Sequence, residues 1–123
     1  MTSASDAGPR RGGPALEAMY GLTLWLIPTL ERFPRRQKFL LGDRIQTTAL
    51  ASLESLTEAT FTRHRAPVLD RVNLDLDKLR LLLRLAKDLS YLDRRRYEHA
   101  ARRLDEVGRL VGGWRRAHRG ASD

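Results

Sequence analysis

The chain has 123 residues, 23 of them basic and 15 acidic, which gives a formal net charge of +8, and it has no cysteine. This length suits one domain or one subunit of an assembly, and the 41% of apolar residues can supply a hydrophobic core. The lack of cysteine excludes disulfides, thiolate zinc sites and thiol catalysis. No apolar run approaches the roughly 20 residues of a membrane span and no signal peptide opens the chain, so we expect a cytoplasmic protein with no membrane partner.

The basic residues are mostly arginine, because 20 of the 23 are Arg and only three are Lys. A GC-rich genome would explain the preference for Arg over Lys, but it would not explain the surplus of positive charge. A basic surplus favours a polyanionic partner such as nucleic acid.

The first half of the chain predicts a tail and two helices. Residues 1–13 are small, polar and glycine-rich, and we expect them to be disordered. Apolar residues recur at steps of three and four over residues 14–33, which predicts a helix that Pro28 should kink. A second helix is expected over residues 36–64, where Gly42 indicates a close approach between helices.

The second half predicts two further helices. One covers residues 67–89, and the other follows Asp93, a suitable N-cap, and continues to about residue 117. Residues 118–123 are expected to be frayed. The gaps between helices are short and no strand-like alternation occurs. The predicted fold is therefore all-α, an antiparallel up-down-up-down four-helix bundle over residues 14–117.

The helix predicted over residues 67–89 is apolar on two sides. Five residues at 4-3-4-3 spacing should face the bundle core: Val72, Leu76, Leu79, Leu83 and Ala86. A second sector beside them widens the apolar arc to roughly 220°: Leu74, Leu81, Leu82, Leu85 and Leu89. A surface helix of a monomeric bundle needs about half of that arc. Deep burial within one compact chain is one explanation, and an oligomer interface through the second sector is the one that we favour.

The remaining sector of this helix carries Arg80, Arg84 and Lys87 at 4-3 spacing, with Asp77 and Asp88 only at its edge. An uncompensated cationic strip of this kind is a candidate phosphate-binding surface, although a solvated helix face has the same pattern.

The last predicted helix combines an apolar face with a ladder of arginines. The inward face is expected to hold Tyr97, Ala101, Leu104, Gly108 and Val111, with Trp114 close to it. On the other side an arginine recurs every seven residues: Arg95, Arg102, Arg109 and Arg116. Glu98 and Asp105 each precede one of them by four residues, so part of the ladder should neutralise itself. The unpaired surplus is expected at the two ends of the helix, in Arg94, Arg95 and Arg96 and in Arg115 and Arg116.

The positive charge is concentrated toward the end of the chain. Residues 84–119 hold 11 basic and 5 acidic side chains, a net charge of +6 out of +8.

No catalytic or metal-binding constellation occurs in the sequence. The three histidines, His64, His99 and His118, have no partner at metal-ligand spacing, and no phosphate-binding loop is present. Glu54 and Glu58 share a helix face, where a polar strip is the simpler explanation than an acid and base pair. We therefore expect a protein that is not an enzyme and that has no metal or cofactor.

Three stretches together resemble a known family of four-helix bundles. The run FPRR at residues 33–36, followed by LG at 41–42, resembles the Pro-Arg and Leu-Gly elements of that family. It includes proteins encoded in intervening sequences of bacterial ribosomal RNA genes and the accessory variability determinants of diversity-generating retroelements. The runs LRLLLR at 79–84 and EVGRLVGGW at 106–114 are similar to segments of the second branch. The resemblance covers about residues 15–117.

The resemblance implies a function as well as a fold. Proteins of the second branch form homopentameric barrels, bind RNA and DNA, and associate with the retroelement reverse transcriptase. They support the synthesis of mutagenised cDNA without being polymerases themselves. Arg80 and Arg84 match the family segment that LRLLLR resembles, Arg109 matches the segment that EVGRLVGGW resembles, and Arg35 matches the Pro-Arg element.

Charge and resemblance together give eleven candidate nucleic-acid contacts: Arg35, Arg36, Arg80, Arg84, Lys87, Arg94, Arg95, Arg96, Arg109, Arg115 and Arg116. Phosphate contacts of this kind are dependent on salt and largely independent of base sequence. The aromatic residues occupy expected core positions and none interleaves the arginines, so base stacking is not predicted. Two other functions stay open: a ribosomal-RNA-associated bundle, and a structural interaction module that binds no nucleic acid.

Overall fold

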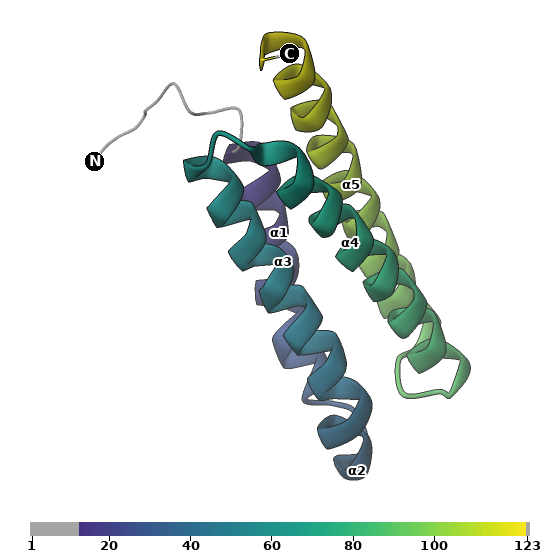
Figure 1. The fold of residues 1–123 in the computed structure, drawn as a ribbon. Coiled ribbons are helices and arrows are strands. Elements are labelled where there is room, and N and C mark those ends of the chain that lie inside the picture. The colour runs from purple at the N-terminus through teal and green to yellow at the C-terminus, as the bar shows by residue number, and fades with distance from the viewer. Residues whose placement is uncertain (1–12, 123) are drawn as a thin grey trace.

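The computed structural model describes residues 13–122 and confirms an all-α fold, with no strand among those residues (Figure 1). Four long helices form the bundle: α1 (Gly13–Leu30), α3 (Asp43–Phe61), α4 (Arg65–Asp88) and α5 (Arg94–Ser122). A short helix α2 (Arg35–Gln37) and a π-helical segment η2 (Lys38–Gly42) connect α1 to α3. Apart from Gly13, the predicted disordered tail lies outside the described residues.

The four long helices form a ring in which each packs against two neighbours. Helix α1 packs against α3 and α5, and α4 packs against the same two helices. The connection through α2 and the turn between α4 and α5 lie toward one end of the bundle, and the α3–α4 connection lies toward the other (Figure 1). Helix α5 therefore has α1 on one side and α4 on the other.

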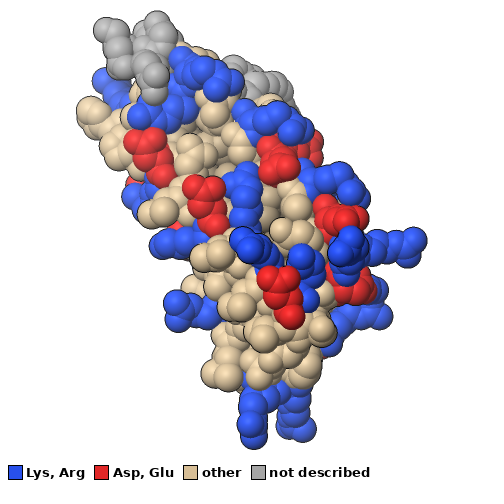
Figure 2. Space-filling view, turned by 90° about the vertical axis from the view of Figure 1, so that its right-hand side faces the viewer, with Lys and Arg blue, Asp and Glu red and all other residues tan. Residues whose placement is uncertain are grey.

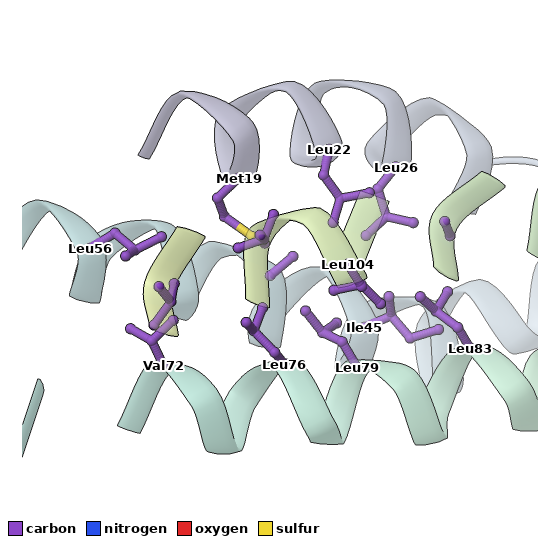
Figure 3. Packing of buried hydrophobic residues seen from close by; sticks show 14 of the residues in the cluster. Met19, Leu22, Leu26, Ile45, Leu56, Val72, Leu76, Leu79, Leu83 and Leu104 are labelled. Carbon is purple, nitrogen blue, oxygen red and sulfur yellow. The ribbon is translucent and has the colours of Figure 1, made fainter. Parts of the chain in front are cut away.

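The core is one cluster of apolar side chains that point into the space enclosed by the four helices (Figure 3). The inner face predicted for the third helix is confirmed, because all five of its residues are buried: Val72, Leu76, Leu79, Leu83 and Ala86. Burying a leucine side chain contributes about 1.5–3 kcal/mol relative to leaving it in water. Burial of these five side chains therefore helps to hold α4 in the bundle.

The inward face of α5 differs from the prediction. Leu104 and Val111 are buried as predicted, and Trp114 is buried with them. The other buried apolar residues are Ala100 and Val107, whereas Tyr97, Ala101 and Gly108 are only half-buried. The physical reason is that α5 packs in the angle between two helices, so its buried sector is centred between α1 and α4. Sequence spacing alone does not identify those two neighbours.

Several predicted helix boundaries also differ. The helix expected over residues 36–64 is divided, since the N–H of Asp43 donates to the carbonyl of Lys38, five residues back, which makes η2 π-helical. A Cβ at Gly42 would lie 3.5 Å from the carbonyl oxygen of Gln37, five residues back in the chain, which is an ordinary contact, so no close approach of another long helix requires this glycine. Helix α4 begins two residues before Pro67, which is tolerated because the first-turn N–H groups have no partner within a helix.

Two helix ends also differ from the prediction. Helix α1 contains Pro28, as expected, but ends at Leu30, before the predicted end at residue 33. Helix α5 continues to Ser122, past the predicted end near residue 117.

The turn between α4 and α5 is closed by a Schellman motif. The N–H of Tyr91 donates to the carbonyl of Ala86, and that of Ser90 to the carbonyl of Lys87. Ser90 takes the left-handed backbone conformation, with φ at 66°, in the position where glycine is usual. The rings of Tyr91 and Phe33 lie 6.0 Å apart, which anchors the turn against the segment that follows α1.

We expect Ser90→Gly to stabilise the protein. Glycine has no Cβ and takes the left-handed conformation without steric cost, so the free energy of unfolding should rise by about 1 kcal/mol. Urea denaturation followed by circular dichroism measures this change. Ser90→Ala keeps the steric cost and is the control, so an equal gain from alanine would contradict the explanation.

Candidate functional site

The predicted cationic strip on α4 is not uncompensated, which corrects the sequence-based expectation. Nη1 of Arg80 lies 2.8 Å from Oδ1 of Asp77, and Nη2 lies 3.4 Å from Oδ1 of Asp105 on the neighbouring helix. The same Nη2 also donates to the carbonyl of Leu104 at 3.4 Å. Arg80 therefore bridges α4 and α5 instead of extending toward solvent.

The other two cations of this strip also have acidic partners. Nε of Arg84 lies 3.9 Å from Asp88, and Nζ of Lys87 lies 3.3 Å from the other oxygen of the same carboxylate. The Lys87 ammonium also lies over the ring of Tyr97, 4.9 Å from its centroid. Asp88 was expected only at the edge of the strip, but its side chain reaches both cations.

The ladder of arginines on α5 differs from the prediction in the opposite direction, because its arginines form fewer ion pairs than expected. Within residues 13–122, neither Glu98 with Arg102 nor Asp105 with Arg109 forms the expected ion pair, and Asp105 pairs with Arg80 instead. Arg102 and Arg109 are exposed and have no ion pair with a described acidic residue. The charges of these two arginines are therefore available to a ligand.

The two ends of α5 differ from each other. Arg115 makes a two-pronged contact with Asp70 of α4, through Nε at 2.6 Å and Nη2 at 3.2 Å. This interhelical pair removes Arg115 from the unpaired cluster that the sequence predicted. Arg116 is exposed and forms no ion pair with an acidic residue of the described part.

The first three turns of α5 line an open hollow of about 770 Å³ between α5 and α1. Helix α1 contributes Trp25, and α5 contributes the arginines at 94, 95, 96 and 102 together with His99. The rings of Trp25 and His99 lie 4.6 Å apart, tilted by 47°. The prediction that no aromatic residue lies among the arginines is therefore wrong.

Asp93 holds one of these arginines in place. Its Oδ1 accepts the backbone N–H of Arg96 at 2.8 Å, which confirms it as the N-cap of α5, and its other oxygen pairs with the Arg96 side chain. The backbone hydrogen bond from Arg96 holds the pKa of the Asp93 carboxyl below its usual value, and the Arg96 and Arg95 charges add to this effect. The side chain of Arg96 is therefore paired with Asp93.

Three arginines of the hollow remain without an acidic partner among residues 13–122: Arg94, Arg95 and Arg102. Arg35 and Arg36 on α2 are likewise exposed, near the same end of the bundle as the α4–α5 turn (Figure 1). Figure 2 shows basic side chains projecting from the margins and lower end of one face, with acidic side chains among them over its upper and middle parts. The available positive charge is therefore greater at one end.

The hollow could not be found from the sequence. His99 shares a face of α5 with Arg95 and Arg102 through steps of four and three, and this spacing is the one signal present. Trp25 lies beside the inner face of α1, and no local pattern shows that this side meets α5.

The second apolar sector of α4 is largely in contact with solvent. Leu74, Leu81, Leu85 and Leu89 are 46–64% exposed, and Leu82 is half-buried. Deep burial within one chain, the first of the two explanations, is therefore wrong for four of the five leucines.

Within residues 13–122 no group of His, Cys, Asp or Glu side chains is arranged to hold a metal ion. No helix of the same part is both long and apolar enough to cross a membrane.

We expect Arg80→Glu to destabilise the protein more than Arg84→Glu does. The first change replaces attraction between helices with repulsion from Asp77 and Asp105, and should lower the free energy of unfolding by about 1 kcal/mol. The second removes only a 3.9 Å exposed pair, and its effect should stay within about 0.5 kcal/mol. Urea unfolding of both variants tests this, and equal losses would contradict the bridging role of Arg80.

The comparison with known proteins bears on the whole bundle. No curated protein and no solved structure matches the chain. Residues 16–118 match the family described as bAvd-like, which spans α1 to α5. The chain therefore belongs to the bAvd-like family, the accessory variability determinants that the sequence motifs resemble, and this membership suggests an accessory protein of a diversity-generating retroelement.

Proposed function

We propose that the protein is a non-enzymatic accessory subunit of a diversity-generating retroelement. In this role it binds the RNA template or the cDNA through its basic surface, associates with the reverse transcriptase and supports mutagenic cDNA synthesis. The observation that carries the proposal is the family match over residues 16–118. The association with a reverse transcriptase is inferred from that family membership and from the resemblance of the motifs.

Nucleic-acid binding is further supported by the unpaired arginines. Arg94, Arg95, Arg102 and Arg109 form no ion pair with a described acidic residue, and Arg35 and Arg36 add two more exposed arginines near the α4–α5 turn. Guanidinium groups suit phosphate oxygens because their N–H donors form a planar fork. Arg80 and Arg115 hold helices together, so their contribution to ligand binding is expected to be smaller.

We expect charge reversal at unpaired arginines to weaken binding far more than reversal at paired cations. Arg94→Glu with Arg95→Glu should weaken RNA and DNA binding at least tenfold and reduce the slope of log K against log salt by about 1.4 for a single strand. Arg84→Glu with Lys87→Glu changes the net charge equally and is the matched control. Fluorescence anisotropy across a salt series measures both quantities.

Two results would count against this part of the proposal. Absence of binding at low salt by the unmodified protein would remove the nucleic-acid function. Equal weakening by the two double variants would show that binding depends on net charge alone and not on the unpaired arginines.

We also propose that the protein assembles through the exposed leucines of α4 as a homopentamer, the number that the family resemblance gives. Leu81→Glu should dissociate the assembly to the 14.1 kDa chain, with helicity retained. Leu24 of α1 is equally exposed, at 64%, so Leu24→Glu is a matched control that should leave the assembly intact. Light scattering at micromolar concentration measures the mass, and a single-chain mass for the unmodified protein would refute assembly.

A further inference from the structure

We propose that the hollow between α1 and α5 binds an unpaired nucleotide, whose base stacks on Trp25 and whose phosphates contact Arg94, Arg95 and Arg102. This inference rests on the proposed function and makes it narrower, because it assigns single-stranded nucleic acid to one site. The opposite is expected from the sequence alone, because no aromatic residue is predicted among the arginines.

The hollow combines the two kinds of group that single-strand binding needs. Proteins that bind single strands combine aromatic side chains, on which bases stack, with cations that contact the backbone. In this chain the aromatic ring comes from α1 and the cations come from the first three turns of α5. The packing of α1 against α5 brings them together.

The Trp25 ring is held in place and still reaches the surface. Its packing against His99, at 4.6 Å between centroids, and against the core supports the ring, while its side chain remains half-buried and lines the hollow. Nε2 of His99 is buried and has no hydrogen-bond partner among the described residues, so the imidazole acts here as a packing group. A supported aromatic ring loses little conformational entropy when a base stacks on it.

One arginine of the hollow has a structural role, and the other three are available to a ligand. Asp93 occupies Arg96 and thereby fixes the start of α5, whereas the other three arginines have no acidic partner among residues 13–122. Arg95 and Arg102 lie on the same side of α5 as His99, one turn before and one turn after it. These two cations therefore flank His99 along the helix.

The size of the hollow favours a nucleotide over a duplex. Its volume of about 770 Å³ is within the roughly 300–1,000 Å³ usual for small-ligand sites. Bases within a duplex stack on each other and pair through their edges, so they present no free face to a tryptophan. Unpaired bases can leave their stack and lie on an aromatic ring.

The test compares a single-stranded oligonucleotide with the duplex of the same sequence, both titrated into the full chain at one salt concentration. We expect Trp25→Ala to weaken single-strand binding at least fivefold, the lower end of what the loss of one stacked base costs. Duplex binding should change less than twofold. Trp25→Phe keeps a ring and should retain most of the affinity, and Tyr20→Ala removes an exposed aromatic of α1 outside the hollow and is the control.

A second measurement needs no change at Trp25. Tryptophan fluorescence of the unmodified protein should be quenched by the single strand and not by the duplex, because Trp114 is buried and Trp25 lines the hollow. Arg95→Gln with Arg102→Gln, two exposed positions, should reduce that quenching at a fixed ligand concentration.

The outcomes separate this inference from the proposed function. Equal affinity of the Trp25→Ala variant and the unmodified protein for the single strand, or quenching by both ligands alike, would overturn the nucleotide site and leave general nucleic-acid binding intact. Absence of binding to either ligand would overturn both. Quenching by inorganic phosphate alone, equal to that by the single strand, would identify the hollow as an anion site and overturn base stacking.

Discussion

The packing of α5 between α1 and α4 brings together candidate functional side chains that lie on different helices. Burial of Ala100, Leu104 and Val107 fixes the rotation of α5 about its own axis, because these residues must face the enclosed core. That rotation places His99 against Trp25 on one flank and Asp105 beside Arg80 on the other. The apolar contacts supply the stability, and the polar contacts at both flanks follow from the geometry that they impose.

The acidic residues decide which arginines are available. Asp70, Asp77, Asp93 and Asp105 each engage an arginine, and three of these four pairs hold an element or a helix end in place. Arg65 is also structural, since its guanidinium donates to the carbonyls of Ala59 and Thr60 at the end of α3 and lies over the ring of Trp114. The number of arginines therefore overstates the size of the binding surface, because some arginines donate to carbonyls at helix ends or join two helices.

Local patterns predicted what a single helix determines and failed where two helices meet. The five inner residues of α4 follow from periodicity, and the cap at Asp93 follows from residue type, since neither depends on a distant partner. The rotation of α5, the pairing of Asp105 with Arg80 and the meeting of Trp25 with His99 depend on tertiary packing across 25 to 74 positions of sequence. The π-helical η2 also escaped prediction, because a shift from four-residue to five-residue hydrogen bonding leaves little trace in the apolar pattern.

The two candidate binding surfaces lie at different parts of the ring of helices. The exposed leucines belong to α4, whereas the hollow with its arginines lies between α5 and α1. Helices α1 and α4 each pack against α3 and α5, so they occupy opposite corners of the bundle. Assembly through α4 would therefore bury its leucines while the α1 side of the hollow stays accessible. In a ring of such subunits the hollows would repeat at regular intervals, and a single strand could contact several of them. Binding at one hollow would then raise the effective concentration of the strand at the next. The total affinity would increase although no individual site binds more tightly.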